Sequence, residues 1–377
     1  MLSRFRIALA LVGVAFAGSF HAAAQRGVVN TAQPLDGLSP ALTAAFSAAA
    51  RLFTKRYTIA DGLGPVFNDG SCADCHRTPA VGAASNRLVT RFGREADGFF
   101  DPLIERGGSL LQTRGIGSVT TPAGSFTFTG ERIPADATVV SHRRTTGLQG
   151  LGLVEAVSGD TWFAIADAEA QTDPSTAGRP ALVLDLATRL PAVGKFGWKA
   201  QVPTLHQFAG DALLNESGIT NPDFPAENCP AGDCSRLDFN PVPAMNDDGR
   251  DVDALTGFMR LLAPPARGAI TDAVASGEQV FAEIGCNGCH LPSIQTTASR
   301  IGALDRVTFH AYSDFLLHDM GALGDGIVQG QAGGREMRTA PLWGLRFAPR
   351  LLHDGSANGV EQAIARRDGQ AARSRAR

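Results

Sequence analysis

The chain has 377 residues, 44% of them hydrophobic, and a formal net charge of −3. This charge balance excludes a protein that binds nucleic acid or a membrane surface through a basic face, and the length is enough for two domains of ordinary size. The 43 glycines and 21 prolines favour a loop-rich protein over a plain helical bundle.

The first predicted element is a secretory signal peptide at residues 1–24. Arg4 and Arg6 precede an apolar run over residues 7–16, and the alanines at 22–24 form a small-residue cleavage site. The apolar run is too short to span a bilayer, and no later segment is long enough. We therefore expect an exported, periplasmic protein with no transmembrane segment in the mature chain.

Two Cys-x-x-Cys-His units, "CADCH" and "CNGCH", carry the chemistry of the sequence. Two cysteine pairs fit a structural zinc site, but zinc does not need a histidine directly after each pair. A redox dithiol needs a β-α-β setting, which neither pair has. A covalent c-type haem uses every residue, because two thiols bond the porphyrin vinyl groups and the adjacent imidazole ligates the iron. We predict two haems attached through Cys72, Cys75, Cys286 and Cys289, with His76 and His290 as proximal ligands, and keep zinc as the alternative.

An aromatic residue lies shortly before each of the two Cys-x-x-Cys-His units. A helix is predicted to start at Ser276, where Gln279 completes a capping box, and it brings Phe281 close to the second unit. Phe67 stands at the matching distance before the first unit. Packing against haem and packing in an ordinary core remain equally open for these rings.

The remaining cysteines, Cys229 and Cys234, flank a Pro-Ala-Gly turn. In an exported protein such a pair predicts a local disulfide. Its expected role is to hold a long loop over residues 210–250, which are rich in Asn, Asp, Pro and Gly.

An internal repeat follows the two units. "RTTGLQGLG" begins at Arg144 and "RTAPLWGLR" at Arg338, with Arg, Thr, Leu, Gly and Leu at matching positions. The order of motifs is therefore the same in both halves. We predict two tandem cytochrome c-like domains that are mainly α, with irregular loops and short β-hairpins.

The domain boundary is placed near the proline pair at 264–265. Residues 252–262 predict an apolar helix that this pair ends. The N-terminal haem c domain, with inserted loops, is then 25–265, and the C-terminal haem c domain is 266–377. Residues 116–134 predict a hairpin that extends from the first domain.

Several segments together resemble the di-haem oxidoreductase family, relatives of the bacterial di-haem cytochrome c peroxidases. In chain order they are "DGLGPVFNDGSCADCH", "GLGLVEA", "KFGWKA", "LAPP", "HDMG", "RTAPLWGL" and "LHDGSA". The resemblance implies that one haem relays electrons while the other meets the oxidant. A small redox protein such as a cytochrome or cupredoxin is the expected donor, and a calcium ion between the domains is a further candidate cofactor.

The sequence departs from this family near its end. The family pattern Ala-Ile-x-x-His-x-Gly-Glu-Ala has Arg367 at the histidine position and Gln370 at the glutamate position here. In the peroxidase relatives this stretch supplies the sixth ligand of the C-terminal haem, and a protonated arginine does not replace it easily. The chain then stops at "AARSRAR", so we expect the C-terminal domain to be truncated at its end.

Other side chains are candidates for the haem surroundings. His318 and Met320 are the candidate distal ligands of the second haem. The alternatives are that His318 forms a hydrogen bond in a turn and that Met320 packs in the core. His353 is expected near or between the haems. Trp343 either lies between the haems or belongs to the core.

Glu155 and Arg144 are the candidate catalytic residues. A peroxidase needs a base that moves a peroxide proton, which a carboxylate such as Glu155 can do, although a structural carboxylate fits equally. Arg144 and Arg338 either bind haem propionates or form ion pairs. The function predicted is a peroxidase-like oxidoreductase; a di-haem electron carrier without substrate chemistry and a degenerate copy remain alternatives.

Overall fold

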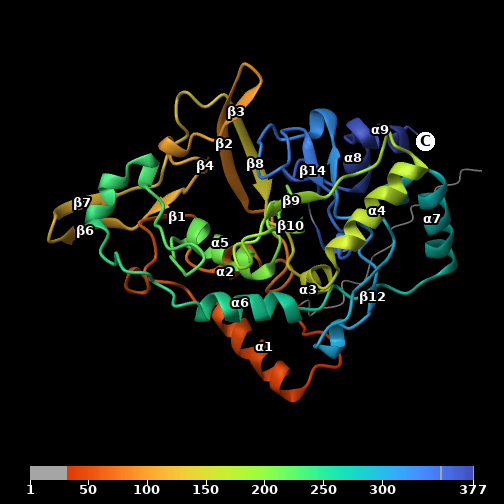
Figure 1. The fold of residues 1–377 in the computed structure, drawn as a ribbon, viewed down its shortest axis with the longest axis horizontal. Helices are drawn as coiled ribbons and strands as arrows, with labels where there is room; N and C mark the ends of the chain where they lie inside the picture. Colours follow the sequence, from red (N-terminus) through yellow and green to blue (C-terminus); the bar gives the residue numbers. More distant parts are fainter. Residues whose placement is uncertain (1–31, 349, 377) are drawn as a thin grey trace, which may run out of the picture.

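The computed structural model describes residues 32–348 and 350–376 (Figure 1), so the predicted signal peptide lies outside the described residues. The described helices are α1 Pro40–Phe53, α2 Cys72–Cys75, α3 Leu151–Glu155, α4 Gly159–Thr172, α5 Leu205–Ser217, α6 Arg250–Leu261, α7 Asp272–Glu283, α8 Val360–Ala365 and α9 Ala372–Arg375. In this part of the chain, no helix has the length and apolar character of a membrane span.

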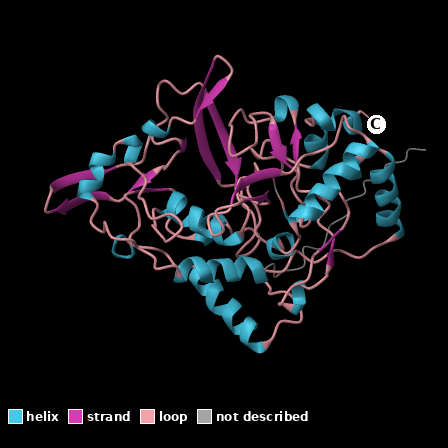
Figure 2. Ribbon diagram, viewed as in Figure 1, coloured by secondary structure: helices cyan, strands magenta, loops and turns pink. Residues whose placement is uncertain are grey.

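The strands are short and lie in separate small sheets (Figure 2). They are β1 Val66–Phe67, β2 Leu88–Ala96, β3 Phe99–Asp101, β4 Ser109–Leu110, β5 Arg114–Gly115, β6 Gly117–Thr121, β7 Gly124–Phe128, β8 Val139–Arg144, β9 Ala181–Leu184, β10 Pro191–Gly194, β11 Ile294–Gln295, β12 Thr308–Phe309, β13 Leu317–Asp319 and β14 Glu336–Arg338. Helix makes up 33% of the structure and strand 18%, with short hairpins and irregular loops as the sequence predicts.

The core begins where α1 crosses α6, at the bottom of Figure 1. The hydroxyl of Ser39 accepts a hydrogen bond from the Leu42 amide and caps α1, which presents Phe46 and Phe53 on one face. Both rings pack on Phe258 of α6, with centroids 5.3 and 4.6 Å apart. These aromatic contacts bury a continuous apolar surface at the base of the molecule.

The same core continues past the predicted boundary at residue 265. Its buried members include Leu35 and Phe258 on one side of the boundary and Ile294, Phe309 and Phe315 on the other. Burial of these side chains in one cluster stabilises both halves of the chain together. The division into two tandem domains stays a prediction.

Three local predictions can be compared directly with the structure. The helix predicted for 252–262 is α6, and the hairpin predicted within 116–134 is β6–β7, which projects at the left of Figure 1. The loop predicted for 210–250 is wrong for its first residues, because α5 extends to Ser217. From there to the start of α6 the chain is irregular, with short 3-10 turns and a disulfide between Cys229 and Cys234.

The helix before the second Cys-x-x-Cys-His unit starts earlier than predicted. It is α7, which begins at Asp272, and Thr271 rather than Ser276 is its N-cap. The Thr271 hydroxyl accepts a hydrogen bond from the Val274 amide 3.3 Å away. Capping by the first suitable hydroxyl therefore outweighed the Ser-x-x-Gln pattern that starts five residues later.

A buried ammonium group joins two distant parts of the chain. Lys199 Nζ lies 2.9 Å from a carboxylate oxygen of Asp325 and 2.6–3.3 Å from the backbone oxygens of Gly333, Gly334 and Glu336. Asp325 also accepts a hydrogen bond from Arg143 Nε at 2.7 Å. The side chains of Lys199 and Asp325 are fully buried, so their charges are balanced by these contacts and not by water.

We predict that Lys199→Met destabilises the protein by about 3–5 kcal/mol, because it leaves Asp325 with one cation fewer and removes the ammonium donor from three carbonyls, of which Gly333 and Gly334 keep a backbone donor. The free energy of unfolding is measured by denaturant titration. The control is Arg94→Met, which removes a half-exposed ion pair with Asp101 and should cost about 1 kcal/mol or less. Equal losses in the two variants would contradict the prediction.

Candidate functional site

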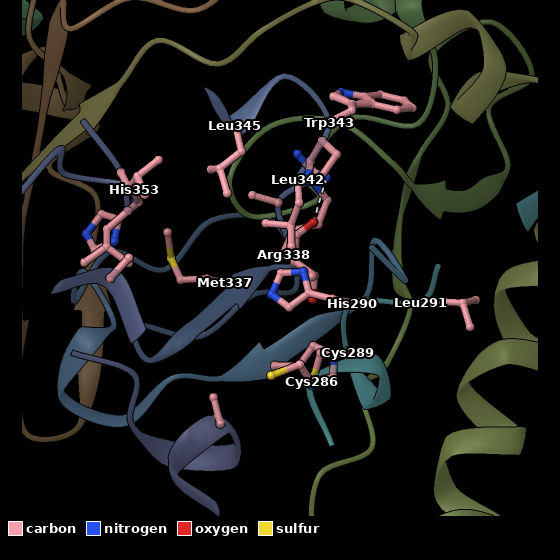
Figure 3. Close-up of a pocket in the computed structure, with 18 of the residues that line it drawn as sticks. Cys286, Cys289, His290, Leu291, Met337, Arg338, Leu342, Trp343, Leu345 and His353 are labelled. Atoms are coloured by element: carbon pink, nitrogen blue, oxygen red, sulfur yellow. Dashed lines mark hydrogen bonds between the residues drawn. The ribbon is translucent and has the colours of Figure 1, made fainter. Parts of the chain in front are cut away.

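A cavity of about 1040 Å³ contains the second Cys-x-x-Cys-His unit. In Figure 3, Cys286, Cys289 and His290 lie together, Met337 and Arg338 approach from β14, and His353 lies beyond Met337. Both repeated elements contribute to the wall, as do α4 and the C-terminal segment from α8 to α9. Segments far apart in the sequence therefore enclose one space.

The two predicted proximal histidines have the same local arrangement. His76 Nδ1 lies 2.9 Å from the backbone oxygen of Thr146, and His290 Nδ1 lies 2.9 Å from that of Tyr312. A donor at Nδ1 leaves Nε2 with its lone pair, which is the form that ligates iron. Burial lowers the pKa of both imidazoles to about 4, with Arg367 contributing to the lowering at His290, so both are neutral near pH 7.

The two arginines of the internal repeat both lie on the cavity wall. Arg144 is half-buried, and its buried Nε and Nη1 atoms lack any hydrogen-bond partner in the described structure. Burial lowers the pKa of Arg144. Arg338 donates from Nε to the Gly197 carbonyl at 2.7 Å. Burial lowers the pKa of Arg338 to about 10, against the opposing effect of Asp314, so it stays protonated.

Trp198 connects the two repeated elements. Its indole Nε1 donates to the Arg144 carbonyl at 2.9 Å, and its own carbonyl accepts from the Arg338 amide at 2.8 Å. Its ring also meets the His353 ring edge-on, with centroids 6.3 Å apart. Trp198 lies in the "KFGWKA" segment, and no local pattern in the sequence singles it out.

The residues around the second unit fit a haem. The donor set is two thiols and a neutral imidazole, the cavity is of cofactor size, and the unpartnered guanidinium of Arg144 fits an anionic group such as a propionate. Phe281 of α7 lies 6.3 Å from His290, centroid to centroid. Trp343 lies on the wall and packs on Phe309.

The first unit lies next to this cavity without opening into it. The wall includes Thr78 and Ser85 from the loop after His76, but not the thiols of Cys72 and Cys75. The ring of Phe53 meets that of His76 edge-on, with centroids 6.2 Å apart, and Phe67 is buried. Phe53 comes from α1, so only the fold reveals this contact.

The alternative of a structural zinc site needs the two cysteine pairs to meet. Among the described residues, one group of three potential metal ligands has its donor atoms within 4.8 Å of one another, and it consists of Cys289, Asp314 and His318. This group contains a single cysteine. The geometry therefore does not favour a four-thiolate zinc site.

The candidate distal ligands differ in what they offer. Both ring nitrogens of His318 have partners, with Nε2 2.9 Å from Asp314 and Nδ1 3.6 Å from Cys289 Sγ. Met320 is buried on the cavity wall, and so is Met337, which the sequence analysis missed although it directly precedes Arg338. Two thioethers therefore face the cavity, while His318 has no free nitrogen.

The carboxylates of Glu155 and Glu169 lie in different places. Glu155 is not part of the cavity wall; it accepts hydrogen bonds from the Leu205 amide at 2.8 Å and from Arg260 Nε at 2.6 Å. Glu169 of α4 does lie on the wall. Burial, followed by the nearby charge of Asp314, raises the pKa of Glu169 to about 7.

The C-terminal segment closes one side of the cavity. The Ser374 hydroxyl donates to the Gly285 carbonyl at 3.1 Å, directly before Cys286. Gln370 donates to the Ala177 carbonyl at 2.8 Å and accepts from the Asp319 amide at 2.7 Å. Arg367, in the same segment, lines the cavity near Cys286 and Cys289, so the position aligned with the family histidine faces the predicted second haem site.

Comparison with known proteins defines the family. The chain belongs to the family described as "Di-haem oxidoreductase, putative peroxidase", whose model matches residues 125–377, about two thirds of the chain. The family implies haem cofactors and includes the second unit within the match; the first unit precedes it.

Among solved structures, hydrazine synthase of Kuenenia stuttgartiensis pressurised with xenon is similar at 14% identity and a TM-score of 0.33, over 97% of this chain and 91% of that chain. No curated protein matches this chain.

We predict that Glu155→Gln lowers the free energy of unfolding by about 1–2 kcal/mol, because Arg260 loses its charged acceptor. Thermal or denaturant unfolding of the haem-loaded protein measures this loss. Glu361→Gln, at an exposed position of α8, is the matched control and should leave stability unchanged. An unchanged midpoint in Glu155→Gln would show that this pair does not stabilise the fold.

Proposed function

We propose that this chain is an exported di-haem c-type oxidoreductase that reduces peroxide with electrons from a small donor protein such as a cytochrome or cupredoxin. The observation that carries the proposal is the cavity at the second unit, where two thiols, a neutral imidazole and an unpartnered arginine surround a space of cofactor size. Family membership supports the oxidoreductase class. The predicted signal peptide supports export.

Cys286 and Cys289 would hold the second haem and His290 would ligate its iron, while Cys72, Cys75 and His76 would do the same for the first. When bound, haem supplies one-electron redox chemistry and, with an open position, reaction with peroxide. Reduction of one peroxide to two waters takes two electrons and two protons. The donor protein would supply both electrons.

The residues of the chain have separate tasks in this scheme. Thr146 and Tyr312 hold the proximal imidazoles by their Nδ1 atoms and so aim Nε2. Arg144, with Arg338 as the second candidate, would neutralise propionates. Glu169 is the wall carboxylate that can take up and release a proton, whereas Glu155 stays a sequence prediction for that role.

An electron carrier without substrate chemistry is the second candidate. It requires a sixth ligand on both irons, and the two buried thioethers of Met320 and Met337 favour it at the second site. Calcium between the domains remains a prediction. In the described residues, the Lys199 ammonium and the Arg143 guanidinium both pair with Asp325 and link the two halves.

We predict two covalent haems per chain, measured as pyridine haemochrome against protein concentration. The double variant Cys286→Ala/Cys289→Ala should carry one, because its second attachment is lost. Haem that extracts into acid acetone, or a ratio near one in the unmodified chain, would contradict covalent attachment at both units. Zinc without iron would support the zinc alternative.

We predict that Arg367→His raises the low-spin fraction of the second haem, because a neutral imidazole ligates iron and a guanidinium does not. Electron paramagnetic resonance of the oxidised protein should show mixed spin before the change and more low-spin signal after it. The matched control is Arg366→His at the adjacent exposed position. Two fully low-spin haems, insensitive to the Arg367 change, would mean that this position does not face the iron.

A further inference from the structure

Arg367 is a cavity side chain without a partner. Its backbone is held, with the amide donating to the Ile364 carbonyl at 3.0 Å and the carbonyl accepting from Arg375 Nη1 at 2.6 Å. Its guanidinium has no hydrogen bond or ion pair with any residue that the structure describes. A fixed backbone with an unpaired charge in a cavity indicates a group that receives a ligand.

The charges around Arg367 depend on the state of the two cysteines. Burial lowers the pKa of Arg367, and the opposing influences come from Cys289 and Cys286. Covalent haem attachment converts both sulfurs to thioethers, which carry no negative charge. The guanidinium stays protonated, because arginine does not lose its proton in proteins, and it then has no anion nearby.

Haem propionates do not fill this role. The thioether bonds are at one edge of the macrocycle, and the propionates extend from the opposite edge. Arg367 lines the same cavity as Cys286 and Cys289 and interacts electrostatically with both, which places it toward the thioether edge. Arg144, whose Nε and Nη1 are also unpartnered, remains for a propionate.

We propose that Arg367 makes the second haem site a binding site for small monovalent anions of the azide, fluoride and hydroperoxide class. The proposal rests on the proposed function, because it needs an open position on the second iron. The guanidinium pairs with the anion through charge-assisted hydrogen bonds, in a cavity where a charge is poorly solvated. The substitution of arginine for the family histidine then replaces an iron ligand with a group that holds the incoming oxidant.

The test is an optical titration of the oxidised two-haem protein with sodium azide and sodium fluoride. We expect Arg367→Gln to weaken the binding of both anions about tenfold or more, which is the effect of losing a charged hydrogen bond. Arg367→Lys should retain part of the affinity, since it keeps the charge without the planar fork. Arg366→Gln, which removes the adjacent exposed arginine, should bind like the unmodified chain.

Neutral ligands separate this inference from the proposed function. Imidazole on the oxidised protein and carbon monoxide on the reduced protein report an open iron without a charge requirement. Unchanged neutral-ligand binding with weakened anion binding in Arg367→Gln supports the inference. Equal anion affinities in all variants overturn it and leave the proposed function intact, whereas an unmodified chain that binds no ligand of either kind overturns both.

Two measurements show whether weaker anion binding comes from misfolding or from loss of haem. Haem content and the unfolding midpoint show whether each variant is folded and carries its haems. If Arg367→Gln does not fold or does not bind haem, the conservative variant Arg367→Lys takes its place. The double variant Cys286→Ala/Cys289→Ala assigns the signal, because the anion response should disappear with the second haem. A response that persists there belongs to the first haem and overturns the inference.

Discussion

The buried ammonium of Lys199 is the constraint on which the cavity depends. An ion of this kind is stable in a protein interior only when oxygen atoms surround it, and here Asp325 and three carbonyls between Gly333 and Glu336 do so. The next residues after Glu336 are Met337 and Arg338, which face the cavity. The position of that wall is therefore set by a contact with a segment more than a hundred residues earlier in the chain.

Trp198 connects the two copies of the internal repeat through hydrogen bonds. One side chain and one carbonyl of the same residue hold the backbones of Arg144 and Arg338, the first residues of the two copies. The copies thus meet at one cavity instead of serving two separate sites. The guanidinium of Arg338 is satisfied by backbone oxygens, whereas that of Arg144 is not, so the two copies have diverged in their electrostatics.

Covalent attachment of haem stays a prediction that rests on the two Cys-x-x-Cys-His units. Cysteine and histidine at fixed spacing act locally, and α6 and the β6–β7 hairpin follow from equally local patterns. The sheet around β2 was missed because its strand has mostly exposed or half-exposed residues without clear alternation. Phe53 beside His76 and Arg260 beside Glu155 depend on contacts between distant segments, which no local pattern encodes.

The C-terminal segment also constrains how the finished protein is made. Ser374 is hydrogen-bonded to Gly285, and Gln370 and Arg373 fix the same segment against the opposite wall. On the proposed function, a rigid macrocycle would have to reach Cys286 and Cys289 before this wall is in place. Cofactor attachment and closure would then be ordered events in maturation, with the polar contacts of the wall formed after the thioether bonds.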